Sequence, residues 1–470
     1  MKKSLTALLF PILMSGSCTV GPDFKVPLFN ADEKWKQKQP ATPTSPTTLP
    51  DTWWRLYKDD ELNRLVDLAF KSNNDLAAAK ARVDTARALA GVDRAKLFPE
   101  LNLNAAANRA RASEDAISEQ MPPGIVIDPY ASRYRSTFDL SFDPDLWGRN
   151  KRQLESSTAQ ADAQQSLLDS QRLGLASEVA RQYFLLRSLD DQEAILNETI
   201  KSRSDALSIQ QSRADAGLAD GLTSSRARTE VELARNDLTD VQRQRGSTEN
   251  ALAVLCGHSP SSFSIARDNK LPPIPSIQAD SPAEVLNRRP DVRAAEQSLR
   301  SANAAIGVAQ ANFYPNFTIN ASAGFESLDA NRFLDWQNRV LSIGAGVAAP
   351  VFNAGSNRAN FDAAVSTRDE ALANYRNSLI VALREVEDSL LDLKTLANSR
   401  QALEQALVSA EVTKKLAQER FDKGLTNYLE VVDADRTVLQ TKLLHSQTDA
   451  RQRITFAVLA KSLGGGWSGK

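Results

Sequence analysis

Four segments of the chain alternate between apolar and polar residues, the pattern of β-strands with two different faces. In the first, Leu101, Leu103, Ala105 and Ala107 alternate with asparagine and other small residues. The other segments run from Tyr134 to Phe142, from Phe317 to Glu326 and from Leu341 to Val347. Each has about ten residues, the length of a strand that crosses a membrane, although a half-buried strand of a soluble sheet has the same period.

Unusually long helical stretches follow each pair of predicted strands. Between Leu146 and Ala216 there is no proline, and about 70 residues at 1.5 Å rise form a rod of about 105 Å. The later stretch has a seven-residue apolar seam, typical of coiled-coil packing, at Leu372, Leu379, Val386 and Leu393, with Leu383 and Leu390 beside it. The first stretch has a weaker seam, which Gln182 interrupts, at Leu168, Leu175, Leu189 and Leu196.

The two halves of the chain repeat the same order of elements. A constant offset of 216 relates Asp75 to Asp291, Gly91 to Gly307 and Pro99 to Pro315. Beyond the strands the offset is 207, as for Gly217 and Gly424, so the first half has extra residues between its strands, within the polar loop 112–132. Each half therefore predicts helix, helix, strand, strand, very long helix and long helix, with four strands in the whole chain.

Four strands cannot close a barrel, and an open sheet edge in lipid leaves backbone groups without hydrogen bonds. Strands in a membrane therefore require an oligomer. A dimer would give eight strands and a barrel filled by its own side chains, whereas a trimer would give twelve strands and room for a lumen.

The first residues have the layout of a secretory signal. Two lysines precede an apolar run and then small residues, so residues 1–17 are predicted to be a signal peptide and 18–58 a lipidated N-terminal tether. Cys18 follows the small residues as the acylated cysteine of a bacterial lipobox would, although Ser15 stands where an aliphatic residue is usual. The alternative is an ordinary signal peptide that leaves a free thiol. Cys256, in an apolar run, is predicted to be a small buried hydrophobe.

Composition and charge exclude several classes of function. The 57 lysines and arginines balance 58 aspartates and glutamates, so the chain lacks the basic surface of a nucleic-acid-binding protein. His258 and His445 are the only histidines, and neither belongs to a zinc-binding or phosphate-binding motif. We therefore expect no enzyme activity, no cofactor, no metal site and no nucleic-acid partner.

Several motifs in this order resemble the TolC-like outer-membrane factors, specifically the lipoprotein branch that serves resistance-nodulation-division (RND) efflux systems. They are CTVGPDFKVP at 18–27, WWRLYKDDELNRLV at 53–66, PDLWGR at 144–149, RRPDVRAAE at 288–296 and APVFNAG at 349–355. The resemblance implies an α+β membrane protein: a homotrimer with a twelve-stranded antiparallel β-barrel in the outer-membrane lipid of a Gram-negative bacterium. A long α-helical coiled-coil barrel continues it into the periplasm.

The resemblance also implies partners and domain limits. The partners are a periplasmic membrane-fusion adaptor and an inner-membrane RND pump. We expect a first outer-membrane-factor repeat at 59–257, a linker at 258–280 and a second repeat at 281–466.

The family closes its periplasmic aperture at the turn between the last two long helices, here residues 420–436. By resemblance, Leu429 and Asp433 match the constricting leucine and the acidic ring, Glu430 a further acidic position, and Arg436 a basic residue near the tip. From the residues alone, Asn427 and Glu430 also fit a helix-capping box, so capping and pore lining are equally open for Glu430. Thr426 replaces an arginine that forms a latch in some members.

The function that follows is a passive exit duct of a tripartite efflux pump for drugs or other small toxic compounds. The rival hypothesis is a periplasmic coiled-coil lipoprotein that spaces the envelope layers. Such a spacer would not require four alternating strands. Within the duct hypothesis, metal-ion export and type I protein secretion are alternatives, because no residue in the sequence identifies the transported substrate.

Overall fold

The computed structural model describes residues 19–29, 32–37, 49–111, 113, 128–218, 220–275 and 279–465. The chain divides into two compact units. The sheet unit comprises the N-terminal residues up to Pro27 together with Asp84–Ala163 and Glu296–Asn374. The helical unit comprises Leu28–Val83, Gln164–Ala295 and Tyr375–Lys470. Each unit therefore takes segments from both predicted repeats.

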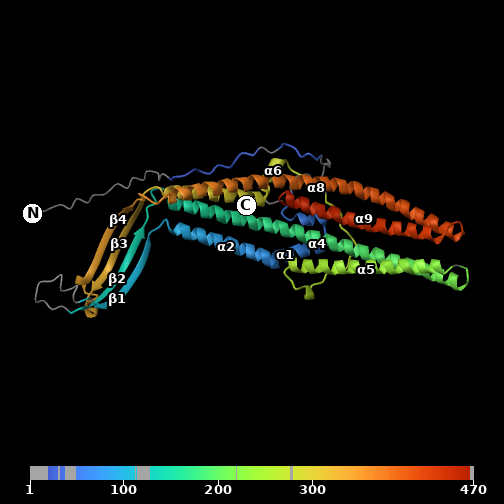
Figure 1. Cartoon of the computed structure of the whole chain (residues 1–470), viewed down its shortest axis with the longest axis horizontal. Helices are drawn as coiled ribbons and strands as arrows, with labels where there is room; N and C mark the ends of the chain where they lie inside the picture. The colour runs from blue at the N-terminus through green and yellow to red at the C-terminus, as the bar shows by residue number, and fades with distance from the viewer. Residues whose placement is uncertain are drawn as a thin grey trace, which may run out of the picture. The chain divides into compact units, whose positions relative to one another are not determined.

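The sheet unit contains a four-stranded antiparallel sheet (Figure 1), in the order β1-β2-β3-β4. The strands are β1 (Glu100–Arg111), β2 (Tyr130–Phe142), β3 (Asn316–Ser327) and β4 (Arg339–Ala348). All four predicted strands are confirmed. The insertion predicted within 112–132 falls largely outside the described residues.

The register of the sheet gathers the apolar residues on one face. Leu103 pairs with Phe138, Phe138 with Ala323, and Ala323 with Leu341, so these side chains form one row across the sheet. In the single chain this face is open, since Phe138 is 54% and Leu341 83% exposed. An apolar face of this size requires a cover, which lipid or another chain can supply.

Four helices each contribute one end to the sheet unit. α2 (Asn74–Ala95) and α7 (Pro290–Ala311) precede β1 and β3, and α4 (Arg149–Asp215) and α8 (Ser356–Asp422) follow β2 and β4. The start of α4 is capped by Asp145, whose carboxylate accepts hydrogen bonds from the backbone N–H groups of Asn150 and Lys151 at 3.0 and 2.9 Å. A carboxylate is favourable there because it meets the positive end of the helix dipole.

The N-terminal segment of the sheet unit is extended and fixed by several contacts. The Val20 N–H donates to the carbonyl of Trp147 at 3.0 Å, and the buried guanidinium of Arg152 donates to Asp23 at 2.7 Å. Gly21 packs directly on Gly307, and a β-carbon at Gly21 would lie 2.4 Å from the Gly307 Cα. Cys18 and the predicted signal peptide lie outside the described residues.

Two helical hairpins make up most of the helical unit. α4 is followed by α5 (Gly221–Leu255), and α8 by α9 (Tyr428–Ser462). Around them lie shorter helices: η1 (Trp53–Tyr57), α1 (Asp60–Ser72), η2 (Pro260–Ser262) and α6 (Pro282–Arg288). The loop between β3 and β4 in the sheet unit contains η3 (Ala330–Arg332) and η4 (Trp336–Asn338).

The hydrophobic core of the helical unit joins both repeats. Trp53, Tyr57, Phe184 and Phe456 are almost completely buried there. The Tyr57 ring lies 4.6 Å from that of Phe184 on α4 and 5.5 Å from that of Phe456 on α9, and its hydroxyl donates to a backbone carbonyl of α9. The aromatic segment before α1 therefore connects the first and second hairpins.

The bounds of the elements confirm the internal repeat. α2 and α7 each have 22 residues, α4 and α8 each 67, and α5 and α9 each 35. α2 and α7 begin 216 residues apart, and α4 and α8 begin 207 residues apart. The two offsets are the ones found in the sequence.

The two predicted seams are confirmed to different extents. In α8, Leu379 and Val386 are buried, and Leu390 and Leu393 pack against the core. In α4, Leu189 and Leu196 are buried, but Leu168 and Leu175 are only half-buried. The core around Gln182 is formed instead by Val179, Tyr183, Phe184 and Leu186, because aromatic residues fill a wider space than one leucine per heptad. Cys256 is completely buried, as predicted.

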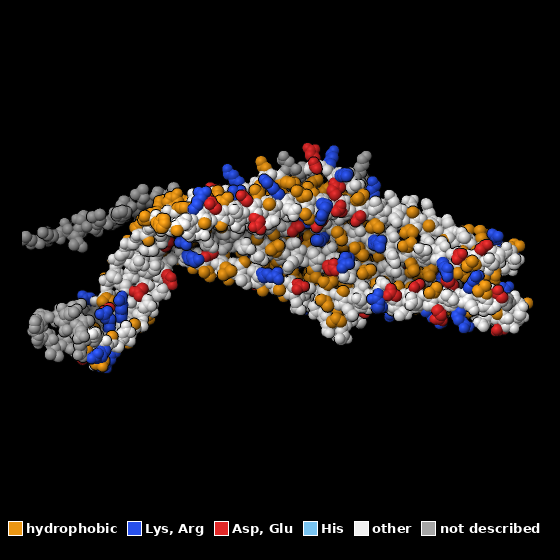
Figure 2. Space-filling model, in the orientation of Figure 1, with side chains coloured by type: hydrophobic (Ala, Val, Ile, Leu, Met, Phe, Trp, Pro, Cys, Tyr) orange, Lys and Arg blue, Asp and Glu red, His pale blue; other side chains and the backbone are white. Residues whose placement is uncertain are grey.

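Charged side chains of both signs are interspersed over the visible helix surfaces (Figure 2). Among the helices that the structure describes, none is both long and apolar enough to cross a membrane.

Candidate functional site: the hairpin tips

The turns that end α4 and α8 have the same geometry, because each contains a glycine in the left-handed conformation. Gly217 has φ +72° and Gly424 φ +70°. After each glycine a leucine N–H reaches back to an arginine carbonyl, Leu218 to Arg213 at 2.8 Å and Leu425 to Arg420 at 2.9 Å. These are Schellman motifs, which satisfy the last carbonyls of a helix.

The start of α9 is capped as the sequence predicts. The side-chain oxygen of Asn427 accepts a hydrogen bond from the N–H of Leu429 at 3.0 Å. Within the described part of the chain, no hydrogen bond joins Glu430 back to Asn427, so only the asparagine half of the capping box forms.

The four predicted aperture residues lie in the first turns of α9. Leu429 is 39% exposed, Glu430 is exposed, and the Asp433 side chain is 62% exposed. Arg436 differs, since its guanidinium donates to the Glu230 carboxylate on α5 and lies 3.9 Å from Asp433. The structure therefore brings Asp433 and Arg436 together and leaves Leu429 and Glu430 open.

A buried ion-pair network behind these residues joins all four long helices. Arg203 of α4 donates to Asp435 of α9 at 2.8 Å and lies 3.2 Å from Glu230 of α5. Lys414 of α8 lies 2.6 Å from Asp435. The side chains of Arg203 and Glu230 are each only 8% exposed, so their charges depend on one another for stabilisation.

Sequence reasoning missed this network because its members are far apart in the chain. Arg203 and Asp435 are separated by 232 residues, and Arg436 and Glu230 by 206. No local pattern marks Glu230. Arg203 has one signal, since it follows Leu196 by seven residues and so continues the predicted seam of the first long helix with a charge.

The network favours the charged forms of Asp435 and Arg436, because it lowers the pKa of the first and raises the pKa of the second. Burial opposes ionisation of Asp435, but the hydrogen bond and charge of Lys414, followed by those of Arg203, outweigh it and lower the pKa of Asp435. The hydrogen bond to Glu230 raises the pKa of Arg436. Burial, helped by the negative charges of Asp435 and Glu230, raises the pKa of the neighbouring Tyr428.

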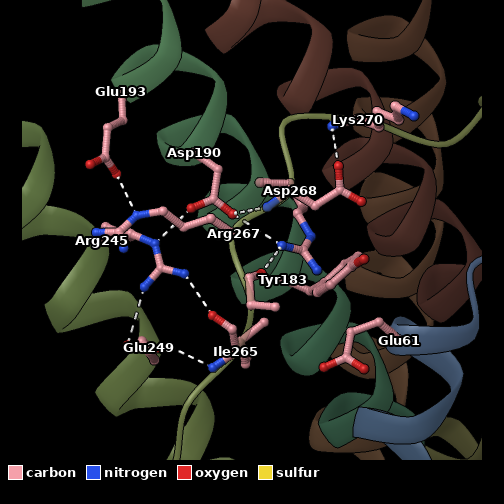
Figure 3. Close-up of polar contacts among 12 residues, drawn as sticks. Glu61, Tyr183, Asp190, Glu193, Arg245, Glu249, Ile265, Arg267, Asp268 and Lys270 are labelled. Atoms are coloured by element: carbon pink, nitrogen blue, oxygen red, sulfur yellow. Dashed lines mark hydrogen bonds and ion pairs between the residues drawn. The ribbon is translucent and has the colours of Figure 1, made fainter. Parts of the chain in front are cut away.

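A second polar cluster attaches the segment after α5 to the first hairpin (Figure 3). The buried Asp190 carboxylate accepts from Arg245 at 2.6 Å, from Arg187 at 3.0 Å and from the Asp268 N–H at 3.2 Å. Arg245 also donates to the carbonyl of Ile265 at 2.8 Å. The same cluster contains Glu249, which accepts from the Ile265 N–H, and the pair formed by Glu193 and Arg267. Its partners are backbone groups and paired charges, so its role is to hold this segment in place.

Among the residues that the structure describes, no group of three or more histidine, cysteine, aspartate or glutamate side chains is placed to hold a metal ion. The ring of His258 bonds to the carbonyl of Cys256 at 2.8 Å.

Comparison with known proteins identifies the family of this architecture. The model of the outer membrane efflux protein family matches residues 65–258 and 282–465, which together make up most of the chain. The chain belongs to the outer membrane efflux protein family. The predicted resemblance is therefore confirmed, and the match in two segments agrees with the internal repeat.

Individual relatives cover the chain from end to end. The solvent efflux pump outer membrane protein SrpC of Pseudomonas putida is 33% identical over 98% of this chain and 98% of its own length. Outer membrane protein OprJ of Pseudomonas aeruginosa is 30% identical over 98% of this chain and 96% of its own. The solved outer-membrane channel OprN matches with a TM-score of 0.87 at 27% identity, covering 96% of this chain and 100% of that one.

Proposed function

We propose that this chain is the outer-membrane exit duct of a tripartite efflux pump. The proposal rests on two properties of the β-sheet, its exposed apolar face and its unpaired edge strands. Its apolar face is exposed, and in the described chain β1 pairs only with β2, and β4 only with β3. A sheet with two open edges is stable in lipid only when its edges pair with other chains. Three copies would close a twelve-stranded barrel with a lumen.

In this proposal the long hairpins extend the lumen into the periplasm, where an adaptor and an inner-membrane RND pump engage them. Residues 59–257 and 281–466 are the two repeats of the duct, with 258–280 between them. The pump supplies energy and selection, and the duct conducts passively. The names of relatives favour small organic compounds as cargo, since SrpC is a solvent efflux protein and another relative, TtgI of P. putida, is a toluene efflux protein.

Conductance of the purified full-length protein in a planar bilayer tests the duct. We expect ion-conducting channels and a heat-modifiable trimer band on a gel. A stable monomer without conductance would instead support the rival function, a periplasmic coiled-coil spacer. The transported substrate is identified in a separate experiment, which compares export of solvents, metal ions and secreted proteins between the parent strain and a strain that lacks the gene.

We further propose that Leu429, Glu430 and Asp433 line the periplasmic aperture, with Arg436 beside them. Their support is exposure at the start of α9, next to a turn held by the buried network. Three copies around an axis would form a ring of carboxylates, which attracts cations and opposes anions.

Lipidation of Cys18 completes the proposal. Each buried CH₂ of an acyl chain contributes about 0.8 kcal/mol to membrane attachment. The neighbouring Val20 and Asp23 are fixed to the start of α4, so an acyl chain at Cys18 would begin beside a structured surface. Wild-type protein should incorporate labelled palmitate and Cys18→Ser should not; absence of label from the wild type would favour the ordinary signal peptide.

A further inference from the structure

The exposed apolar face of the sheet, which contains Leu103, Phe138 and Leu341, is called the outward face below. It ends in arginines at one end only. Arg109 and Arg111 continue the alternation that begins with Leu101 on β1, and Arg339 begins the row of Leu341 on β4. They lie near the loops that join β1 to β2 and β3 to β4, and Figure 2 shows basic side chains gathered at this end of the strands. At the helix end, the last outward positions of the strands are apolar: Leu101, Phe142, Phe317 and Val347.

Charges within the strands are sorted between the two faces. The acidic residues Glu100, Asp139 and Glu326 all have the opposite parity to the apolar row, so they occupy the polar face. Arg133 and Arg135 share that face, and each lies 3.6 Å from Glu326. The outward face of the four described strands therefore carries arginines and no carboxylate.

Aromatic rings accompany the outward arginines. The guanidinium carbons of Arg109 and Arg111 lie 5.5 and 5.9 Å from the ring centre of Tyr130. That of Arg339 lies 4.4 Å from the ring centre of Trp336, which is 72% exposed. Tyrosine and tryptophan beside basic residues are typical of the interface between hydrocarbon and lipid headgroups.

Along the register, Arg339 is level with Phe325, Ser136 and Ala105, so it is displaced by four residues from Arg109. Through Ser141, Glu100 is level with Asn320, four residues beyond the start of β3 at Asn316. At the loop end, β3 and β4 are displaced in the same direction relative to β1. Such a stagger belongs to strands that tilt in a barrel, so Arg109 and Arg339 take corresponding places at the loop end.

The distance along β1 agrees with the thickness of a bilayer. Eight residues separate Leu101 from Arg109, and at a rise of about 3.4 Å and a tilt of about 40° they span about 21 Å vertically. The apolar band of membrane barrels is about 25 Å tall. Arg109 thus falls where the hydrocarbon ends.

We propose that Arg109, Arg111 and Arg339, with Tyr130 and Trp336, bind the phosphate groups of anionic lipid in the outer leaflet. Arginine suits phosphate because its planar fork donates two hydrogen bonds at once. A cationic belt at only one end of the strands matches a bilayer whose two leaflets differ in charge. The inference rests on the proposed position of the sheet in the membrane.

The test compares two double variants that remove the same charge from the same end of the sheet. Arg109→Gln with Arg339→Gln alters the outward face, and Arg133→Gln with Arg135→Gln is the control on the polar face. The probe is diphosphorylated lipid A in mixed detergent micelles, titrated into the purified full-length protein. An arginine near an anionic lipid surface contributes about fivefold to affinity, so the outward variant should bind about thirtyfold more weakly. The control should change binding less than about twofold.

Equal affinity of wild type and both variants would overturn the inference. So would displacement of lipid A by inorganic phosphate at the same phosphate concentration, because that marks a bare anion site. If the glutamine variant does not fold, Arg109→Lys with Arg339→Lys preserves the charge; binding within about fivefold of wild type supports the inference, and complete loss contradicts it. Conductance of the same samples separates the two proposals. If the proteins conduct ions but the variants bind lipid A equally well, only the lipid-binding inference is wrong. If the wild type does not conduct, the duct proposal is wrong.

Discussion

At the scale of single residues, Arg203 is one of the points where the two hairpins meet. Its buried guanidinium is shared by Glu230 of the first hairpin and Asp435 of the second. Buried charges are stable only when paired, so any other register of the hairpins would leave at least one of them isolated. The network therefore selects one arrangement of the helices more than it adds net stability.

Removing Glu230 tests this role. Glu230→Ala leaves Arg203 with one carboxylate fewer and takes the partner from Arg436, so we expect a loss of about 3 kcal/mol in the free energy of unfolding. Glu232→Ala, on the same helix, removes only an exposed pair with Arg235 and should cost less than about 1 kcal/mol. Denaturant unfolding followed by circular dichroism measures both. Equal effects would show that the burial of Glu230 is irrelevant.

The contact between the hairpins should also weaken in acid. The folded state lowers the pKa of Asp435, so ionised Asp435 stabilises the fold above its unfolded pKa of about 4. This contribution is lost as the pH falls through the lower, folded pKa. The protection factors of α9 amides, which compare each exchange rate with its intrinsic rate at the same pH, should therefore fall below about pH 4 in the wild type. Asp435→Asn should be less protected at neutral pH and show a smaller acid response; an unchanged response would exclude Asp435 as its source.

Local chemistry was predictable at this scale and distant pairing was not. The Asn427 cap depends on the N–H of Leu429, two residues away, so its residue type alone indicates its role. The partner of Arg436 is 206 residues away, and the sequence offers many exposed carboxylates at helical spacing. Nothing in the sequence singles out Glu230 among them.

At the scale of elements, glycines decide where the hairpins turn. Gly424 has φ +70°, and apart from its own chain neighbours no heavy atom of the described residues lies within 4 Å of the point that a β-carbon would occupy, so the cost of a side chain there is conformational. Gly424→Ala should lower the free energy of unfolding by about 1 kcal/mol. Gly246→Ala, inside α5 and also without a close neighbour, should raise it by about 0.5 to 1 kcal/mol. Thermal unfolding of both variants measures the difference, and the same sign for both would contradict this account.

Element types and lengths followed well from the sequence because the repeat supplies each pattern twice. The helices of the two halves agree in length, and all four strands form where the alternation predicts. The strands extend beyond the apolar alternation, as at Arg109 and Arg111 on β1. An arginine ends an apolar pattern without ending a strand, so the sequence placed the boundary too early.

At the scale of the whole molecule, the single chain is incomplete. In the part of the chain that the structure describes, the sheet has two open edges and an exposed apolar face, and apolar residues such as Val408, Val412 and Leu416 are exposed along α8. Residues four apart lie on one side of a helix, so these three form a stripe that requires a neighbour. In the proposed trimer the neighbour is a second copy of the chain.

The proposed acidic ring would be a property of that assembly and not of one chain. Three copies of Asp433 would gather around the axis, and a carboxylate about 5 Å from a permeating cation contributes about 0.8 kcal/mol even in water. Asp433→Asn should therefore lower the preference for cations over anions at least about fourfold. The reversal potential under a salt gradient in a planar bilayer measures the change. Asp240→Asn is the control, because Asp240 pairs with Arg243 on the exposed side of α5. If both variants keep wild-type selectivity while still conducting, the selective element of the aperture lies elsewhere on the tips.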